Sequence, residues 1–321
     1  MKAVLLPLML AAAPAAAAEL TVYAPDYFAS EWGPGPAIEK GFEAQCNCDL
    51  KFVTGDVLPR LQLEGARATA DVVLGLNTDE TARARALDLF APHGQDVADL
   101  TMPVAWADDI FLPFDWSELA FVYDSTRLAT PPESFAQLLE SDVKIVIQDP
   151  RSSTLGLSLI LWVNAIYGDD APEVWEKLAP KVLTVTKGWS EAYGMFTDGE
   201  ADMVLSFITS PAYHIIAEKD ETKKAAIFPE GHYFYVETAA KMKNAPNPDL
   251  AAEFMEYILS EEFQAMIPEG NWSFPAKLPT DKLPEGFRAL PVPEKTLFYS
   301  EAEAEALRQP ALEQWLKAFV R

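Results

Sequence analysis

The fold is decided by three short apolar runs, which read LTVYA over 20–24, LKFV over 50–53 and ADVVLGL over 70–76. Runs of this length with β-branched and aromatic residues favour strands. The segments between them suit helices, because Ile38 and Phe42 lie one helical turn apart and a further helix is predicted over 58–65. Thr78 is predicted to cap the helix that follows the third strand.

A second set of strands and helices begins near residue 143. Strands are predicted over 143–148, 182–186 and 203–207, and helices over 154–167 and from about residues 190 and 210. Strands that alternate with helices of this length form parallel βαβ units with right-handed crossovers. Two such sets predict an α/β protein of two lobes, with parallel-type sheets flanked by helices. Ligands in such sheets bind beyond the carboxyl ends of the strands, so an interlobe cleft is the expected ligand site.

Two long extended segments, 111–124 and 232–241, are interpreted as crossings between the lobes. Both are aromatic and rich in β-formers, although ordinary core strands would have the same composition. The hinge interpretation divides the chain into 19–115 for the first part of lobe 1, 116–236 for lobe 2, and 237–321 for the second part of lobe 1 with the C-terminal helices.

The first 18 residues have the features of a secretory signal peptide. Lys2 gives a positive start, residues 3–13 are apolar, and Ala16-Ala17-Ala18 matches an A-x-A cleavage pattern. The alternative is a membrane anchor, but the apolar run is too short to span a bilayer. The sequence therefore predicts cleavage near Ala18-Glu19, a periplasmic location and no membrane insertion.

The charge of the chain limits its partners. With 49 acidic and 25 basic residues the formal net charge is −24, and a chain of this charge repels nucleic acid. An acidic field favours a cationic ligand, although acidity also keeps an exported protein soluble. The length of the chain also favours two domains. A single hydrophobic core rarely extends beyond about 250–300 residues, and this chain has 321.

The two cysteines form the motif Cys46-Asn47-Cys48. An oxidising compartment favours a disulfide between them. Two thiols without a nearby histidine make an incomplete zinc site, since His93, His214 and His232 are widely separated. A structural disulfide is expected, and neither a metal nor a cofactor.

The turn after the strand 143–148 allows two interpretations. It reads Asp149-Pro150-Arg151-Ser152-Ser153-Thr154 and leads into a helix. Hydroxyls and free backbone N–H groups at a helix N-terminus can hold an anion. The same residues can also simply cap the helix.

Four aromatic residues follow predicted strands or an apolar helix. They are Trp189, Phe207, Tyr213 and Trp272. Aromatic rings at the rim of a cleft can stack on flat ligand rings or face a cation, whereas each ring taken alone could equally belong to a core. Asp26 and Asp56 also follow strands, where carboxylates could balance a cation.

The usual signatures of catalysis are missing from the sequence. It contains no G-x-S-x-G elbow, P-loop, H-E-x-x-H motif or dinucleotide-binding glycine fingerprint. This favours a binding protein over an enzyme.

Several longer motifs resemble those of the periplasmic thiamine-binding proteins of Gram-negative bacteria. The similarity runs from the signal peptide to the C-terminal helix. It is carried by residues 20–23, 31–36, 46–48, 70–76, 148–154, 186–194 and 209–214.

The resemblance implies a two-lobed periplasmic binding protein of class II with a hinge. It implies high-affinity binding of thiamine and its mono- and diphosphate esters, and delivery to an ABC-type permease and, through it, an ATPase. Ser153 and Thr154 match the family's pocket residues on the phosphate side of the ligand. Trp189 matches the aromatic residue beneath the thiamine rings. The ligand-binding residues carried over are Asp26, Tyr27, Gly55, Asp56, Ser153, Thr154, Trp189, Phe207, Ile208, Thr209, Ser210, Tyr213 and Trp272.

Three positions depart from the family pattern. Phe207 replaces a tyrosine, so a hydroxyl is lost there. The turn at Gly55 and Asp56 is shortened, which makes its Asp-Gly match ambiguous. Pro25-Asp26 replaces a tyrosine-aspartate pair, so an aromatic ring at that place must come from Tyr27.

Two other functions compete with thiamine import. The cargo could instead be a polyamine, a ferric ion or sulfate. A polyamine, or another small cation, suits the acidic charge but would not use an anion-binding turn. A ferric site needs clustered tyrosines, which the sequence does not show. Thiamine-degrading enzymes of similar fold use a cleft cysteine, whereas both cysteines here lie at the end of a predicted helix.

Overall fold

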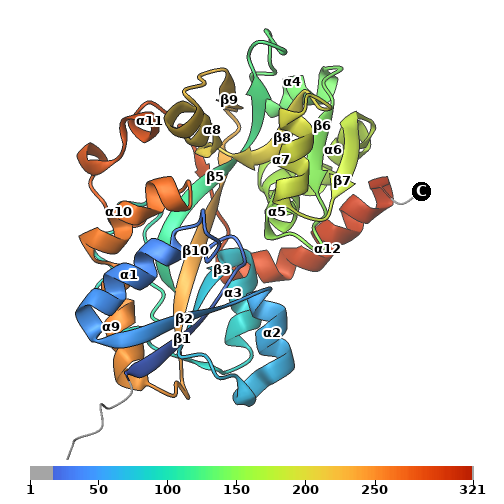
Figure 1. Cartoon of the computed structure of the whole chain (residues 1–321). Coiled ribbons are helices and arrows are strands. Elements are labelled where there is room, and N and C mark those ends of the chain that lie inside the picture. The colour runs from blue at the N-terminus through green and yellow to red at the C-terminus, as the bar shows by residue number, and fades with distance from the viewer. Residues whose placement is uncertain (1–16, 320–321) are drawn as a thin grey trace, which may run out of the picture.

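The computed structural model describes residues 17–319, so the predicted signal peptide lies almost entirely outside the described residues. Within this range, strands and helices alternate in both predicted sets (Figure 1). Among the described residues, no helix has the length and apolar character needed to cross a membrane.

The first lobe is built on a parallel sheet. Its strands are β1 (Ala18–Ala24), β2 (Cys48–Thr54) and β3 (Val72–Asn77), with β1 in the middle. Its helices are α1 (Gly35–Cys46), α2 (Val57–Glu64) and α3 (Thr78–Arg85). Ile38 and Phe42 are buried on α1, as the helical spacing predicted. The predicted cap at Thr78 was wrong, because the side chain of Asn77 accepts the hydrogen bond from the Asp79 N–H at 2.7 Å.

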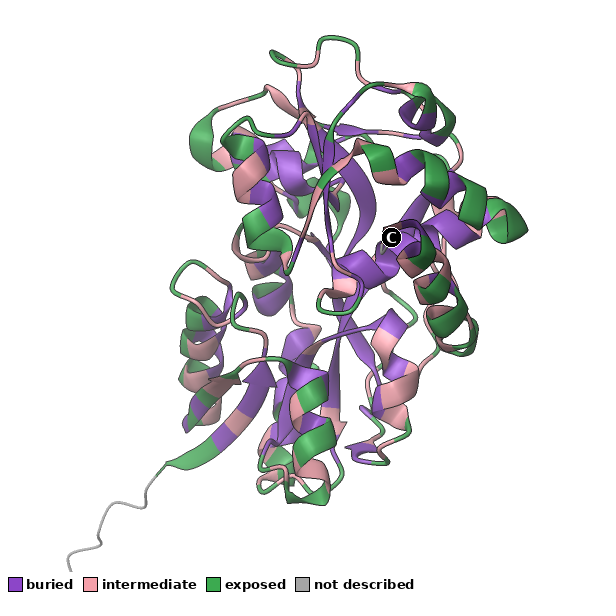
Figure 2. Cartoon of the chain, turned by 90° about the vertical axis from the view of Figure 1, so that its right-hand side faces the viewer, coloured by how far each residue is buried: buried purple, intermediate pink, exposed green. Residues whose placement is uncertain are grey.

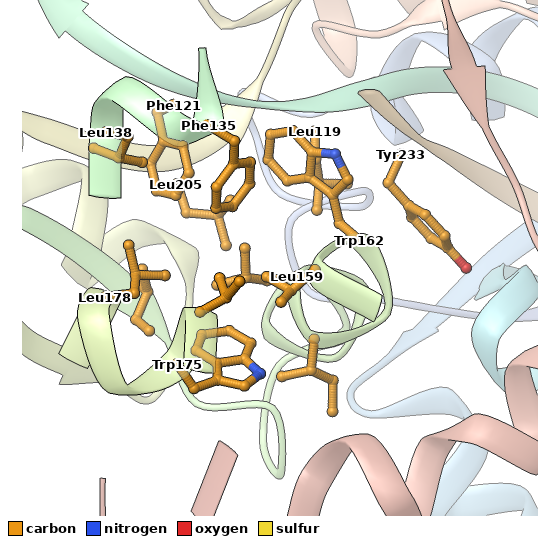
Figure 3. Packing of buried hydrophobic residues seen from close by; sticks show 14 of the residues in the cluster. Leu119, Phe121, Phe135, Leu138, Leu159, Trp162, Trp175, Leu178, Leu205 and Tyr233 are labelled. Carbon is orange, nitrogen blue, oxygen red and sulfur yellow. The ribbon is translucent and has the colours of Figure 1, made fainter. Parts of the chain in front are cut away.

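The second lobe repeats this arrangement. Strand β6 (Ile145–Gln148) lies between β7 (Val182–Thr186) and β8 (Met203–Phe207), and all three are parallel. The helices are α4 (Phe135–Glu140), α5 (Thr154–Tyr167), α6 (Ala171–Leu178) and α7 (Trp189–Thr197). Helix α5 is apolar on nearly every face and lies in the core of this lobe. Its Trp162 packs among Phe121, Phe135 and Leu119 (Figure 3).

The predicted crossing segments are the two longest strands of the structure. β5 (Leu112–Asp124) and β10 (His232–Met242) pair with each other, β10 also pairs with β3, and β5 also pairs with β8. The sheet order is therefore β2-β1-β3-β10-β5-β8-β6-β7. Figure 2 shows that this central part of the sheet is almost entirely buried. These strands connect the lobes and are also core strands of the continuous sheet, and the hinge interpretation stays a prediction.

The remaining elements cover the sheet and its ends. They are β4 (Phe90–Ala91), α8 (Ser210–Tyr213) with a π-helical turn over His214–Glu218, β9 (Lys223–Ala226), α9 (Pro248–Ile258), α10 (Glu261–Gly270), β11 (Phe274–Pro275), α11 (Glu285–Arg288), β12 (Thr296–Leu297) and α12 (Glu301–Phe319).

Helix α12 belongs to both lobes. Its Ala311 and Trp315 are buried in the core of the second lobe, while Glu301 pairs with Arg85 of α3 at 2.7 Å. The boundaries predicted at residues 115 and 236 did not anticipate this bridging position, and they stay a prediction.

The C-terminal end of α1 holds the disulfide. Cys46 and Cys48 are bonded, with Cα atoms 5.2 Å apart. Asn47 between them has a left-handed conformation with φ of 51°. The carboxamide of asparagine makes it one of the few non-glycine residues that adopt this conformation readily.

Candidate ligand-binding site

A large cavity lies between the two lobes. Its volume is about 1360 Å³, and it is lined from the first lobe by residues after β1, β2 and β3 and from the second lobe by residues after β6, β7 and β8. Because the strands of each lobe are parallel, their carboxyl ends all face this space. The cavity is therefore where the βαβ pattern predicted the ligand cleft.

Ten of the thirteen predicted site residues line this cavity. They are Tyr27, Gly55, Asp56, Ser153, Thr154, Trp189, Phe207, Ser210, Tyr213 and Trp272. Contact with a ligand remains a prediction for each of them.

The other three predicted residues do not line the cavity. Asp26 is exposed on the loop after β1, and its neighbour Tyr27 faces the cavity instead. Ile208 is fully buried in an apolar cluster with Trp116 and Phe234. Thr209 is also fully buried, and its hydroxyl is hydrogen-bonded to that of Ser117 at 3.0 Å. The run 207–210 was carried over as a block, but Ile208 and Thr209 point inward from the cleft wall.

For two of the three departures from the family pattern, those at Pro25-Asp26 and Phe207, a nearby residue carries the missing group. Tyr27 supplies the aromatic ring that Pro25-Asp26 lacks. The ring of Phe207 packs edge-on against Tyr235, with centroids 5.0 Å apart, and Tyr235 brings a hydroxyl to the cavity. Sequence reasoning missed Tyr235, although the alternation Tyr233, Tyr235, Glu237 predicts one shared face of the strand.

One wall of the cavity is aromatic. The Trp189 ring stacks on that of Tyr193 with centroids 4.7 Å apart and an interplanar angle of 25°. Its indole N–H donates to the Ser206 hydroxyl at 2.8 Å, and 40 % of the residue remains exposed. Tyr213 and Trp272 meet edge to face, with centroids 5.1 Å apart. These contacts fix the rings in place, which leaves their open faces available to a flat ligand.

A hydrogen-bonded chain supports this wall from behind. The Tyr193 hydroxyl contacts His214 Nε2 at 2.9 Å, and His214 Nδ1 contacts Glu218 Oε2 at 2.6 Å. His214, Glu218 and Asp220 lie close enough together to suggest a cation site. Both ring nitrogens of His214 are already used by protein groups, however, so the cluster serves as a support for Tyr193.

A neighbouring part of the same wall, the turn between β6 and α5, is suited to an anion. Ser153 caps α5 by accepting a hydrogen bond from the Gly156 N–H at 3.4 Å, so the capping interpretation holds. An accepting hydroxyl keeps its own proton free to donate. The first N–H groups of α5 have no partner within the helix. Arg151, Lys187 and Arg308 also line the cavity, and of these Arg151 and Arg308 are paired with Asp149 and Glu305. Capping and anion binding are therefore compatible here.

The Ser153→Ala/Thr154→Ala double variant separates the two roles. Loss of the cap should lower the free energy of unfolding by about 0.5–2 kcal/mol. Loss of two donors should weaken thiamine monophosphate at least about tenfold, or about 1.4 kcal/mol, and leave thiamine nearly unchanged. The ratio of the two dissociation constants, measured by calorimetry in wild type and variant, decides the point. An unchanged ratio means that the turn is only a cap.

The floor of the cavity is acidic. Glu237 of β10 lines it, and Asp115 lies directly opposite Glu237 on β5. Only 1 % of Asp115 and 4 % of Glu237 are exposed. Glu80 of α3 also lines the cavity, and burial raises its pKa to about 7. Sequence reasoning missed all three, because it searched for carboxylates after strands and these lie within a strand or on a helix.

The two acids that the sequence did predict have different positions. Asp56 lines the cavity at the start of α2 but is exposed, whereas Asp26 is exposed and outside the cavity. Asp56→Asn should weaken thiamine by about 0.2–1 kcal/mol, the usual value for exposed charge pairs, and the loss should shrink in high salt. Asp26→Asn is the matched control and should leave the dissociation constant unchanged. Calorimetry at two salt concentrations tests both, and equal losses for the two variants would contradict the assignment.

Comparison with known proteins shows the family to which the chain belongs. Residues 14–265 match the family of bacterial extracellular solute-binding proteins. The chain is 48 % identical over 308 residues to the thiamine-binding periplasmic protein of Escherichia coli K12, covering 94 % of each chain. It is 48 % identical over 317 residues to that of Brucella abortus, covering 96 % of this chain and 95 % of the relative. These relatives are binding proteins, which agrees with the expectation that the chain is not an enzyme.

Solved structures of periplasmic binding proteins have the same fold as this chain. A structure described as a periplasmic thiamin binding protein superposes with a TM-score of 0.90 at 48 % identity, covering 94 % of this chain and 96 % of its own. Iron-bound HitA from Pseudomonas aeruginosa superposes with a TM-score of 0.76 at 20 % identity, which shows a common fold alone. The chain belongs to the bacterial extracellular solute-binding proteins, in the same family as the thiamine-binding periplasmic proteins.

Proposed function

We propose that this protein binds thiamine and its mono- and diphosphate esters in the interlobe cavity. The observation that carries the proposal is the three-part lining of the cavity. Aromatic rings form one part of the lining, carboxyl groups form the floor, and a helix N-terminus with basic side chains lies next to Trp189. Thiamine has two flat rings and a positive thiazolium, and its esters add a phosphate, so each part of the ligand meets a matching surface. The 48 % identity to thiamine-binding proteins supports the same ligand.

Binding of thiamine is tested with the purified mature chain. Calorimetry should give one site with micromolar or tighter affinity, and tryptophan fluorescence should fall as the rings stack near Trp189 and Trp272. Spermidine, a polyamine of similar positive charge, should not compete, since it has no ring to stack. An absence of heat and of quenching at micromolar thiamine would falsify the proposal, and displacement by spermidine would favour a polyamine carrier.

Transport follows from closure of the lobes on the ligand. Bending of β5 and β10 would bring the two walls together, and a ligand that contacts both walls shifts the equilibrium toward the closed form. The closed form would then dock on an ABC-type permease, which works with an ATPase. Thiamine-dependent stimulation of ATP hydrolysis by the reconstituted transporter tests this step.

The periplasmic location depends on removal of the signal peptide. The proposed cleavage near Ala18-Glu19 removes the apolar run 3–13 and leaves β1 at the start of the mature chain. Mass spectrometry of the protein from a periplasmic extract should give a chain that begins at Glu19. Retention of the full apolar run in a membrane fraction would instead show an anchor.

A further inference from the structure

The strongest unexplained feature is the pair of carboxyl groups in the floor of the cavity. Asp115 and Glu237 are register partners in the pairing of β5 with β10, where a register shift follows at Thr238. Side chains of directly paired residues lie on the same face of a sheet and within about 5.5 Å at Cβ. Here the amide nitrogen of Asn271 is hydrogen-bonded to one oxygen of each carboxyl group, which places the two groups side by side. Two ionised carboxylates offer only acceptors and repel each other, whereas one proton on the pair supplies a donor between them.

Neighbouring side chains donate hydrogen bonds to the two carboxyl groups but bring no positive charge to balance them. The amide of Asn271, in the loop after α10, donates to Asp115 Oδ2 and to Glu237 Oε2, the latter at 2.8 Å. The Tyr27 hydroxyl donates to Glu237 Oε1. Within residues 17–319, no lysine, arginine or histidine forms an ion pair with either carboxyl group. All of these contacts are therefore with neutral donors.

The titratable groups near the pair are carboxyl groups and tyrosine hydroxyls. Tyr27 approaches from the loop after β1, and Tyr235 neighbours Glu237 on β10. Asp79 and Glu80 of α3 lie near Tyr235. Arg83 of α3 is paired with Glu80 and Glu305 at 3.7 and 3.6 Å. Burial first, and then the charge of Glu237, raise the pKa of Asp115 well above its usual range, and burial raises the pKa of Glu237. Both effects favour keeping a proton on the pair at neutral pH.

We propose that the Asp115–Glu237 pair shares one proton in the ligand-free protein and releases it to solvent when a cationic ring binds, so that Glu237 recognises the positive charge of the ligand. This inference rests on the proposed function and deepens it. Glu237 is the member of the pair that lines the cavity, and Asp115 lies behind it as the proton carrier. A cation next to the pair favours its fully ionised form, in which Glu237 and Asp115 both carry a negative charge.

The sign of the pH dependence follows from this proton release. Below the raised pKa of the ligand-free pair, the cation must displace a proton, so its affinity falls as the pH is lowered. Above that pKa no proton remains to be displaced, and the affinity becomes constant. With one proton released, affinity rises by at most about tenfold per pH unit. A neutral ligand of the same shape gains nothing from the second negative charge, and its affinity should not rise with pH.

The test is calorimetry of thiamine binding in buffers of different ionisation enthalpy. Measurements are made between pH 6 and 8.5, where the aminopyrimidine of thiamine itself stays unprotonated. Wild type should release up to one proton and bind more tightly as the pH rises. A neutral thiophene isostere of thiamine should show neither effect.

Two variants assign the effect to the pair. Asp115→Asn keeps the shape and supplies a permanent donor to Glu237, so it should bind thiamine without proton release and with a flat pH profile. Glu237→Gln removes the recognising charge, and it should lose at least about tenfold for thiamine but little for the isostere. Circular dichroism checks that both variants are folded.

The outcomes separate this inference from the proposed function. Thiamine binding without proton release and with a constant dissociation constant overturns the inference alone. Failure of thiamine to bind overturns the proposed function and the cation role of Glu237 together. A carboxyl-carbon NMR titration of the ligand-free protein gives a check that needs no ligand, since the shared proton requires one of the two acids to titrate well above the usual range. Ordinary titration of both acids would rule the shared proton out.

Discussion

Trp189→Ala is expected to weaken thiamine binding by between about 5-fold and 160-fold. Stacking of one heterocyclic ring on an aromatic side chain contributes about 1–3 kcal/mol when measured by alanine substitution. Trp189 is suited to this contact, because Tyr193 covers one face of its ring and Ser206 fixes its N–H. The measurement is the dissociation constant by calorimetry, together with the fraction of fluorescence quenching that remains.

Ser206→Ala and Trp106→Phe are the matched controls. Ser206→Ala keeps the Trp189 ring but removes the hydrogen bond that orients it, so its loss of affinity should be smaller than that of Trp189→Ala. Trp106 lies outside the cavity lining, with its N–H bonded to the Phe111 carbonyl at 2.9 Å, and Trp106→Phe should leave thiamine affinity unchanged. Full affinity in Trp189→Ala would show that this wall does not contact the ligand.

Trp162→Ala should have the largest effect on stability, a loss of about 3–5 kcal/mol in the free energy of unfolding. Trp162 is fully buried in the core of the second lobe. Its ring contacts Phe121, Phe135 and Phe228 at centroid distances of 6.0, 5.2 and 6.3 Å. Figure 3 shows Trp162 beside Phe121 and Phe135. Alanine leaves a cavity that this packed cluster cannot fill. Denaturant titration at constant slope measures the loss.

A pair of phenylalanine variants separates packing from hydrogen bonding in this core. The indole N–H of Trp162 donates to the Gly231 carbonyl at 2.9 Å, whereas that of Trp175 has no partner among the described residues. Both tryptophans are fully buried. Trp162→Phe leaves a buried carbonyl unpaired and should therefore cost about 1–3 kcal/mol more than Trp175→Phe. Equal costs would mean that packing alone determines the stability of the cluster.

The positions of most helices and strands could be predicted from local sequence patterns. The helix 154–167 and the strands 182–186 and 203–207 have the predicted bounds, because each coincides with an apolar segment of the right length. The cap before α3 was misassigned by one residue, since Asn77 and Thr78 are both good caps and only the backbone conformation selects between them.

The candidate site was predicted only in part. Residues that follow strands, such as Trp189 and Thr154, could be placed at the cleft because strand ends meet there. Ile208 and Thr209 were misplaced because the direction of each side chain in a short turn depends on how that turn packs. Glu237 and Asp115 could not be predicted, because they are 122 positions apart in sequence and become neighbours only through the pairing of β5 with β10.

The sequence by itself determined the alternation of strands and helices, the two-lobed class and the aromatic character of the cleft, since these depend on hydrophobic periodicity and on residues next to each other in the chain. The tertiary structure alone decided which acids face the ligand and that α12 joins both lobes. Those features depend on strand register and long-range packing. A buried carboxyl pair has the same local sequence as two exposed acids, and only the neighbours that exclude water distinguish the two cases.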